Sequence, residues 1–355
     1  MAADPRAALS PADPGPGGEY PRGGGRTPVA GDGGADLDGG TAGSQEYHEP
    51  GSDRVEAMTR FEGLVPAAIT PMQANGSIDE EAFRGVLDFN LDAGVHGFWV
   101  AGGTGESVLL DDAENRRLAE MAAEQVSGRG ITIMHVGAPT TARAAALAEH
   151  AAHAGVTAIC CVPPFFYRRT DDEIAEHYRV VAAAADLPLF VYNLPGMTGV
   201  EITLDLMRRI QDAVPQLVGL KHSSTLFANV HDFAQMGLQC FIGSSALMLP
   251  ALTVGAVGCV DGPPLMAPEV WMRIWQAHLK GDRPAAEAAQ RDARGVIALA
   301  RHFDGGRYFG VMKAVLGHRI GLDCGDPRLP AAPLTAAQKQ EVIQLAEKLE
   351  LHPLG

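Results

Sequence analysis

The sequence predicts an α/β fold of the (β/α)8 TIM-barrel type, with a C-terminal helical extension and a disordered N-terminal tail. Eight short apolar runs alternate with longer alanine-rich helical patterns. Several runs are apolar throughout, as expected of strands whose two faces are both covered by helices. A doubly wound open sheet is the alternative, but it usually has fewer strands and a glycine-rich phosphate turn after the first. The first run here ends in Ile69-Thr70-Pro71-Met72, which favours the barrel.

The expected elements follow one another from residue 61 onward. Strands are expected at Leu64–Thr70, Gly97–Ala101, Ile131–Gly137, Thr157–Val162, Pro188–Asn193, Leu217–His222, Gln239–Gly243 and Ala256–Asp261. Helices between them are expected at Glu80–Ala93, Asp112–Val126, Thr141–Ala154, Asp171–Ala185 and Thr203–Ala213. Serine, threonine and aspartate precede the helices, and glycine follows several of them, as at helix termini generally.

The two ends of the chain differ from the predicted barrel core, which we place at residues 58–266. Residues 1–57 are rich in proline, glycine and aspartate and show no apolar periodicity, so burial cannot offset the entropy of ordering them. We expect a disordered tail there. Residues 267–355 are expected to form the last barrel helix and an all-helical extension, at Pro268–Lys280, Arg283–His302, Tyr308–Leu316 and Thr335–Leu349.

Charge and cysteine usage exclude several classes of function. The formal net charge of −15 argues against binding nucleic acid or an anionic membrane, because both require a basic surface. No run reaches the roughly 18 apolar residues of a membrane span. The five cysteines show no CxxC pair and no zinc spacing, and four lie in apolar segments. We therefore expect a cytoplasmic protein with no metal and no cofactor.

Lys221 is the clearest indication of chemistry in the chain. It ends the apolar run that begins at Leu217, where a core residue is expected. Burial of an ammonium group is costly, and a buried lysine commonly becomes neutral through a lowered pKa. A neutral lysine is a nucleophile that forms Schiff bases with ketones. The alternative is that the strand simply ends and Lys221 points into solvent, since lysine usually avoids burial.

Other polar groups follow the strands at the end where barrel enzymes place their active groups. The turn Gly102–Ser107 exposes backbone N–H groups, and Thr104 adds a hydroxyl donor, so the turn suits a carboxylate. The alternative is a plain tight turn before the next helix. Glu106 is expected to be structural, bonding backbone groups in the turn.

Tyr192 lies on the strand before Lys221 and is expected to point inward near the same layer. A phenol there could move protons to and from a carbinolamine, although an ordinary core tyrosine is the alternative. His222 should face the opposite side, whereas Ser223 returns to the inner side and could contact substrate. Gly243 and Val260, at the ends of the seventh and eighth strands, complete the expected substrate-binding residues.

Two further polar residues have structural interpretations beside functional ones. His135 has no second ligand at metal spacing, which favours a hydrogen-bonded core histidine. Asp261 is expected either to bind a substrate hydroxyl or to cap the next turn. A metal-dependent barrel aldolase would require a cluster of ligands, and the sequence offers none.

Three motifs in order resemble the dihydrodipicolinate synthase / N-acetylneuraminate lyase family: Gly103-Thr104-Gly105-Glu106, Tyr192-Asn193-Leu194-Pro195 and Gly219-Leu220-Lys221. The resemblance covers the chain from about Phe61 to the C-terminus. It implies a (β/α)8 barrel, often tetrameric, that forms a Schiff base with a 2-oxo acid. It further implies that Lys221 is the Schiff-base lysine, that Tyr192 relays protons, and that Gly103 and Thr104 hold the carboxylate.

Several positions depart from the pattern of individual subfamilies. Dihydrodipicolinate synthases carry a threonine at Gly103, a tyrosine from the neighbouring subunit at Phe166 and a carboxylate-binding arginine at Met197. We therefore do not expect authentic synthase activity, because methionine cannot replace a guanidinium. Sialic acid lyases carry an acidic pair at Ser245 and Ala246, which argues against sialic acid.

The remaining motifs do not select one subfamily. The turn after the second strand and Pro163-Pro164 resemble sugar-acid dehydratases, such as those acting on 5-dehydro-4-deoxyglucarate, but those lack Leu194-Pro195. We predict a lyase, either aldolase or dehydratase, that acts on a 2-oxo acid such as pyruvate or a 2-keto-3-deoxy sugar acid. The alternatives are a 4-hydroxy-tetrahydrodipicolinate synthase-like protein with altered substrate and a catalytically weak 2-oxo-acid-binding homologue. A homo-oligomer, dimer or tetramer, is expected.

Overall fold

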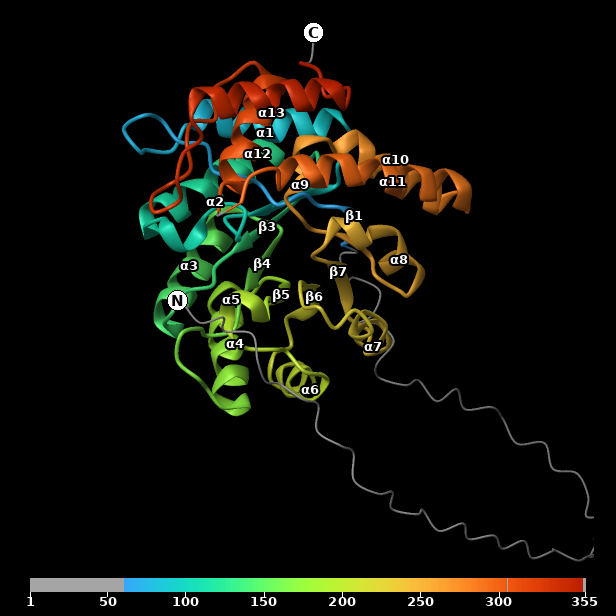
Figure 1. Cartoon of the computed structure of the whole chain (residues 1–355). Coiled ribbons are helices and arrows are strands. Elements are labelled where there is room, and N and C mark those ends of the chain that lie inside the picture. The colour runs from blue at the N-terminus through green and yellow to red at the C-terminus, as the bar shows by residue number, and fades with distance from the viewer. Residues whose placement is uncertain (1–60, 305, 354–355) are drawn as a thin grey trace, which may run out of the picture. The chain divides into compact units, whose positions relative to one another are not determined.

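The computed structural model describes residues 61–304 and 306–353, so the predicted tail at residues 1–57 lies outside the described residues. Eight parallel strands form one sheet in the order β1-β8-β7-β6-β5-β4-β3-β2, surrounded by helices (Figure 1). The strands are β1 Gly63–Leu64, β2 Gly97–Val100, β3 Ile131–His135, β4 Ala158–Cys161, β5 Leu189–Asn193, β6 Leu217–His222, β7 Gln239–Ile242 and β8 Gly258–Cys259. The predicted barrel fold is confirmed.

The two ends of the sheet meet between β1 and β2. The backbone N–H of Ala68 donates to the oxygen of Trp99, and the N–H of Trp99 donates to the oxygen of Pro66, both at 3.0 Å. As regular hydrogen-bonded strands, β1 and β8 are shorter than the sequence predicted. Pro66 has no N–H to give to a ladder, which interrupts the first strand. Its neighbour Val65 still bonds to β8, since the Val65 N–H donates to the Cys259 oxygen at 3.0 Å.

The helices between the strands were predicted well where they are long. They are α1 Glu80–Asp92, α2 Asp112–Val126, α3 Thr141–Ala154, α4 Asp171–Ala185 and α6 Leu204–Ala213. The side chains of Asp79, Asp111 and Thr170 accept the backbone N–H groups that open α1, α2 and α4, as the sequence indicated. Four short helices were not predicted, because one or two turns show no periodicity: α5 Pro195–Thr198, α7 Asn229–Gln235, α8 Met248–Thr253 and α9 Pro263–Met266.

The C-terminal helices follow the eighth strand, as predicted. They are α10 Pro268–Leu279, α11 Arg283–Ala300, α12 Tyr308–Ile320 and α13 Ala336–Lys348. Helix α12 packs against α1, α9 and α13 and lies with them along one side of the barrel (Figure 1). None of the described helices is long and apolar enough to cross a membrane.

The core has two layers, one between strands and helices and one inside the barrel. Large aromatic side chains fill the inner layer. Phe61 and Phe190 pack edge to face with ring centroids 5.1 Å apart, and Phe241 lies 5.8 Å from Phe190. Because Phe61 precedes β1, this plug lies toward the amino ends of the strands. The inner space at their carboxyl ends is therefore left for polar groups.

Candidate active site

Lys221 is buried inside the barrel, with 4 % of its surface exposed. Its Nζ lies 4.3 Å from the ring centroid of Tyr192 and 5.3 Å from that of Trp99. Tyr192, Lys221 and Phe241 are in-register partners on β5, β6 and β7, so their side chains point to the same side of the sheet. The structure therefore brings the predicted lysine and the predicted tyrosine together.

A β-bulge in β6 turns Lys221 inward. Leu189 pairs with Leu217 and Phe190 pairs with Gly219, so Val218 is an extra residue in the ladder. The extra residue reverses the alternation of side chains, and bulges commonly re-aim a side chain beside an active site. Gly219 is required at this point: a Cβ there would lie 2.1 Å from the backbone oxygen of Gln239 and 2.8 Å from the Phe190 ring.

The turn after β2 lies beside Tyr192. A Cβ on Gly103 would lie 3.7 Å from the Tyr192 hydroxyl oxygen, in ordinary contact distance. The turn contains two non-glycine residues with positive φ, Ala101 at 50° and Glu106 at 61°. The Thr70 hydroxyl stabilises the turn by donating a hydrogen bond to the backbone oxygen of Gly105 at 2.8 Å.

Glu106 is structural, as expected, but its partners lie outside the turn. Its carboxylate pairs with Lys313 of α12 at 2.8 Å, and both side chains are fully buried. The backbone N–H of Arg328 donates to the same carboxylate at 2.7 Å. Burial lowers the pKa of Lys313, and the charge of Glu106 opposes that shift. The C-terminal extension therefore fixes the shape of the turn.

The other predicted substrate residues lie at the ends of the last three strands. Ser223 and Gly243 face each other, since a Cβ on Gly243 would lie 1.9 Å from the Ser223 Oγ. Val260 is fully buried in the inner core layer. Asp261 is a cap: its carboxylate accepts the N–H groups of Ser245 and Gly262, each at 2.8 Å.

His222 faces away from Lys221, as predicted. Its Nδ1 lies 3.2 Å from the Asn193 amide nitrogen, and its Nε2 lies 3.1 Å from the Leu226 oxygen. Asn193 also donates to Glu201 at 2.7 Å. This network joins the ends of β5 and β6 on the helix side. It therefore supports the strands that carry Tyr192 and Lys221.

The sequence did not identify Trp99 as a neighbour of the lysine, and for His135 it favoured a structural role in the core. Trp99 and His135 come from β2 and β3, and their rings lie edge to face with Tyr192, with centroids 5.7 and 6.1 Å away. Burial, and then the nearby charge of Lys221, lower the pKa of His135 to about 4. His135 is therefore neutral near pH 7. No group of three metal-ligating side chains occurs among residues 61–304 and 306–353.

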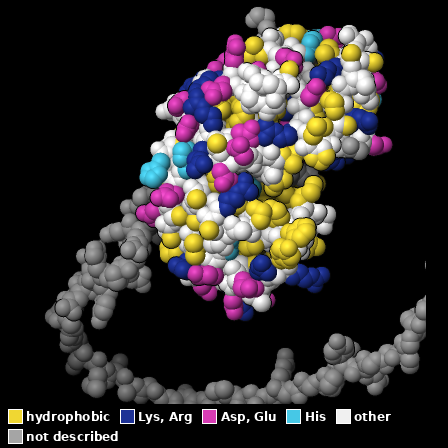
Figure 2. Space-filling view, turned by 90° about the vertical axis from the view of Figure 1, so that its left-hand side faces the viewer, with side chains coloured by type: hydrophobic (Ala, Val, Ile, Leu, Met, Phe, Trp, Pro, Cys, Tyr) yellow, Lys and Arg dark blue, Asp and Glu magenta, His cyan; other side chains and the backbone are white. Residues whose placement is uncertain are grey.

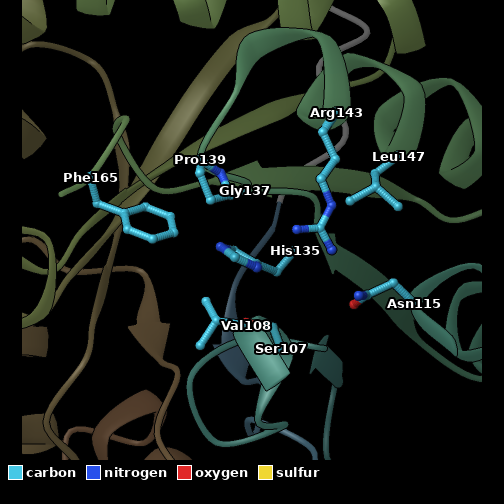
Figure 3. Close-up of a pocket in the computed structure, with 9 residues that line it drawn as sticks. All are labelled: Ser107, Val108, Asn115, His135, Gly137, Pro139, Arg143, Leu147 and Phe165. Atoms are coloured by element: carbon cyan, nitrogen blue, oxygen red, sulfur yellow. The ribbon is translucent and has the colours of Figure 1, made fainter. Parts of the chain in front are cut away.

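A separate cavity of about 150 Å³ lies beside His135 (Figure 3). His135 stands in the middle of the view, between Phe165 on one side and Arg143 on the other. Arg143 is paired with Asp112 at 2.6 Å, and Lys221 does not line this space. We therefore place the candidate site at Lys221 and not in this cavity, because the reactive groups gather at Lys221.

Comparison with known proteins agrees with this geometry. Residues 60–349 match the dihydrodipicolinate synthetase family. An uncharacterized DapA-like lyase of Halobacterium salinarum is 36% identical over 271 residues, which is 76% of this chain and 87% of that protein. A 4-hydroxy-tetrahydrodipicolinate synthase of Azoarcus is 32% identical over 285 residues, 79% of this chain and 96% of that protein.

A solved structure shows the same likeness. The sialic acid aldolase of Ruminococcus gnavus superposes with a TM-score of 0.77 at 25% identity, covering 81% of this chain and 98% of that one. The match spans the whole barrel and the C-terminal helices, and the named relatives are lyases, synthases and aldolases. The chain therefore belongs to the dihydrodipicolinate synthetase family and is a lyase.

Proposed function

We propose that the chain is a Schiff-base-forming aldolase or dehydratase that acts on a 2-oxo acid such as pyruvate or a 2-keto-3-deoxy sugar acid. The observation that carries the proposal is the buried amine of Lys221, 4.3 Å from the ring centroid of Tyr192. A Cβ on Gly103 would lie 3.7 Å from the hydroxyl oxygen of the same tyrosine, so the turn after β2 also lies beside Tyr192. These two contacts of Tyr192, with the lysine and with the turn, support the proposal.

In the proposed reaction the Lys221 amine, in its unprotonated form, attacks the C2 ketone and forms a carbinolamine. Tyr192 delivers a proton to the carbinolamine oxygen, which leaves as water and gives a protonated imine. The backbone N–H groups of Gly103 and Thr104 hold the carboxylate, which fixes the ketone against the amine. The imine then accepts the electron pair of the C3–C4 bond as the C4 hydroxyl loses its proton. In a dehydratase, C3 instead loses a proton and C4 loses hydroxide. In the aldolase the resulting enamine takes up a proton at C3 and becomes an imine again. Water finally hydrolyses the imine, which releases the 2-oxo acid and the free lysine.

Two positions that differ from the pattern of the known subfamilies support a substrate different from those of the named relatives. Met197 on α5 is uncharged and 82 % exposed, so it cannot bind a substrate carboxylate as the arginine of the synthases would. Ser245 is buried, and it is an uncharged residue where the sialic acid lyases carry an acidic one; its backbone N–H donates to Asp261 and its backbone oxygen accepts from Trp271. Both support an altered distal substrate group rather than a dipicolinate or a sialic acid.

Surface and thiol features support the expected assembly and location. Phe166 is 86 % exposed and Tyr167 66 %, and hydrophobic side chains are visible on the face turned to the viewer in Figure 2. Exposed aromatic pairs of this size mark interfaces, so we propose a homodimer or homotetramer. The five free cysteines are all buried, which fits a reducing cytoplasm.

The second candidate is a catalytically weak 2-oxo-acid-binding homologue. Gly103 and Phe166 favour it, because each lacks a hydroxyl that dihydrodipicolinate synthases carry at that position. Both candidates bind a 2-oxo acid, but only the lyase converts it to product. A panel of sugar acids separates them, since only the lyase releases product.

Borohydride trapping with pyruvate tests the proposal directly. We expect a mass increase that peptide mapping assigns to Lys221. Lys221→Ala should abolish the adduct, whereas Lys280→Ala, which changes an exposed lysine, should keep it. An adduct that survives Lys221→Ala would overturn the Schiff-base assignment. Trapping without turnover of any 2-oxo acid in the panel would favour the binding protein.

A further inference from the structure

We propose that Lys313 of α12 is a positioning residue of this site, and that its buried ion pair with Glu106 holds the turn after β2 in the shape that binds the substrate carboxylate. The inference rests on the proposed Schiff-base function, in which the backbone N–H groups of Gly103 and Thr104 hold that carboxylate. It assigns to Lys313 an effect on the affinity for substrate in addition to its effect on stability. The motifs that carry the family resemblance do not include this lysine.

The turn contains backbone conformations that need support from outside the turn. Ala101 has φ 50° and Glu106 has φ 61°, so both lie in the left-handed region that residues other than glycine rarely adopt. Such conformations persist where the surrounding structure determines them strongly. At Glu106 the support reaches the side chain: its carboxylate lies 2.8 Å from the Lys313 Nζ and accepts the Arg328 N–H at 2.7 Å. The C-terminal extension therefore holds one of the two left-handed residues directly.

The conformation at Glu106 determines which way the carboxylate-binding N–H groups point. The Glu106 N–H donates to the Gly103 oxygen at 3.2 Å, and the Ser107 N–H donates to the Gly102 oxygen at 3.3 Å. In a trans peptide the carbonyl and the following N–H point in opposite directions. The first bond therefore directs the Thr104 N–H away from Glu106. The second bond directs the Gly103 N–H in the same manner, away from Ser107.

Lys313 lies at the centre of the contact between the turn and the C-terminal extension. The side chains of Lys313 and Glu106 are both fully buried, so water cannot replace either partner of the pair. The Lys313 Nζ also donates to the backbone oxygen of Asp326 at 3.0 Å. Close by in the same segment, the Arg328 guanidinium binds the two carboxylate oxygens of Glu114 at 2.6 and 2.7 Å. Lys313 thus joins α12, the segment that follows it and the turn.

Loss of Lys313 should reduce the fraction of molecules in which the turn is ready to bind. The Glu106 carboxylate would then be buried beside no cation, which favours conformations that bring it to water and release the backbone at 106. The apparent dissociation constant is the intrinsic one divided by the binding-competent fraction. Saturating substrate restores full occupancy, because binding draws the remaining molecules into the competent state. Lys221 and Tyr192 lie on β6 and β5 and should react at an unchanged rate once substrate is bound.

The test uses the pyruvate concentration that gives half-maximal borohydride-trapped adduct. We expect Lys313→Met to raise this concentration about tenfold, as for a competent fraction of about one tenth. The amount of adduct and its rate of formation at saturation should stay as in wild type. Arg319→Met is the matched control, because it removes another buried cation of α12, whose partners are Glu269 at 2.9 Å and the Met266 oxygen at 2.6 Å. It should destabilise the protein without changing the half-maximal concentration.

Arg328→Gln is a second variant, which leaves the buried pair intact. The side chains of Arg328 and Glu114 are 22% and 21% exposed, so this change is less disruptive to folding than the loss of a fully buried charge. It loosens the segment whose N–H donates to Glu106, and we expect a rise of about threefold in the half-maximal concentration. If Lys313→Met does not fold, Arg328→Gln decides the question. Thermal unfolding of each variant shows that the assays are run on folded protein.

The outcomes separate this inference from the proposed function. If wild type forms the adduct and the half-maximal concentration is unchanged in the folded variants at 313 and 328, the role of Lys313 is overturned and the Schiff-base function stands. An equal rise in Arg319→Met would also overturn it, because the effect would then follow from general loosening of α12. A lower amount of adduct at saturation with no shift in concentration would overturn it as well. Absence of any adduct in wild type would overturn the proposed function and this inference with it.

Discussion

Tyr192 and Lys221 are in-register partners on neighbouring strands, and the lysine amine lies 4.3 Å from the centroid of the tyrosine ring. The pairing fixes their separation through backbone hydrogen bonds rather than through loop geometry. Sites carried by strands hold their groups more precisely than sites carried by loops. The proposed proton transfer between the phenol and a carbinolamine on the lysine therefore requires no large movement of either residue.

The first prediction concerns Tyr192. Tyr192→Phe should slow formation of the imine about 100-fold or more, which is the usual contribution of a positioned proton donor. The reason is that the carbinolamine oxygen loses its proton source while the amine stays in place. Rapid-quench borohydride trapping with pyruvate measures the rate. Tyr178→Phe is the matched control, because that buried tyrosine donates to the Cys161 oxygen at 3.0 Å outside the barrel interior. Equal rates for wild type and Tyr192→Phe would contradict the proposed relay.

The second prediction concerns the buried pair of Glu106 and Lys313. Glu106→Gln leaves the Lys313 charge buried without its partner, which should lower the free energy of unfolding by about 3 kcal/mol or more. A double-mutant cycle with Lys313→Met, followed by chemical denaturation, should show strong coupling between the two changes. The exposed pair of Arg208 and Asp205 is the control, and breaking it should cost less than about 1 kcal/mol. Additive effects at 106 and 313 would show that the pair does not act as a unit.

The third prediction concerns acid sensitivity from buried histidines. Burial lowers the pKa of His177 to about 4, and burial with the charge of Lys221 does the same for His135. As the pH falls, the two histidines therefore take up protons in the unfolded chain first, near pH 6.5, and in the folded chain only near pH 4. Their contribution to stability is complete above pH 6.5 and is lost progressively as pH falls toward 4.

Denaturation curves between pH 7.5 and 4 measure this loss, which we expect to reach about 3 kcal/mol for each fully buried histidine. His135→Gln should flatten the curve, provided the variant folds, and His177→Gln gives a second measurement at another position. His153→Gln changes an exposed histidine and should leave the curve as in wild type. A wild-type curve that is flat from pH 6.5 to 4 would refute the assignment.

The fourth prediction concerns assembly. Phe166 is 86 % exposed and has a positive φ of 77°, which is uncommon for a bulky residue. A strained, exposed aromatic is expected to be retained for contact with another subunit. Phe166→Asp should dissociate the proposed oligomer in sedimentation experiments. Leu279→Asp, which changes a 65 % exposed residue at the end of α10, should leave the assembly intact. A wild-type protein that sediments as a monomer would remove the basis of the proposal.

Much of the fold could be predicted because its signals are local. Asp79, Asp111 and Thr170 precede helices that they do cap, and each cap depends on atoms within a few residues. The apolar runs lie where strands form. The short helices α7 and α8 were missed, since two turns or fewer carry no periodic signal. The roles of Lys221, Tyr192 and the substrate-binding residues stay predictions until the trapping experiments are done.

The sequence by itself determined the order of strands and helices and placed Lys221 at the end of a buried run. Only the tertiary structure decided that Lys221 points inward, because simple alternation from Val218 would turn it outward and the bulge in β6 reverses the phase. It also brought Glu106 to Lys313 of α12 and to Arg328, which is 222 residues away in the chain. Such contacts join separate elements through space. Their physical cause is the closure of the barrel and the packing of α12 against it, which no window of neighbouring residues contains.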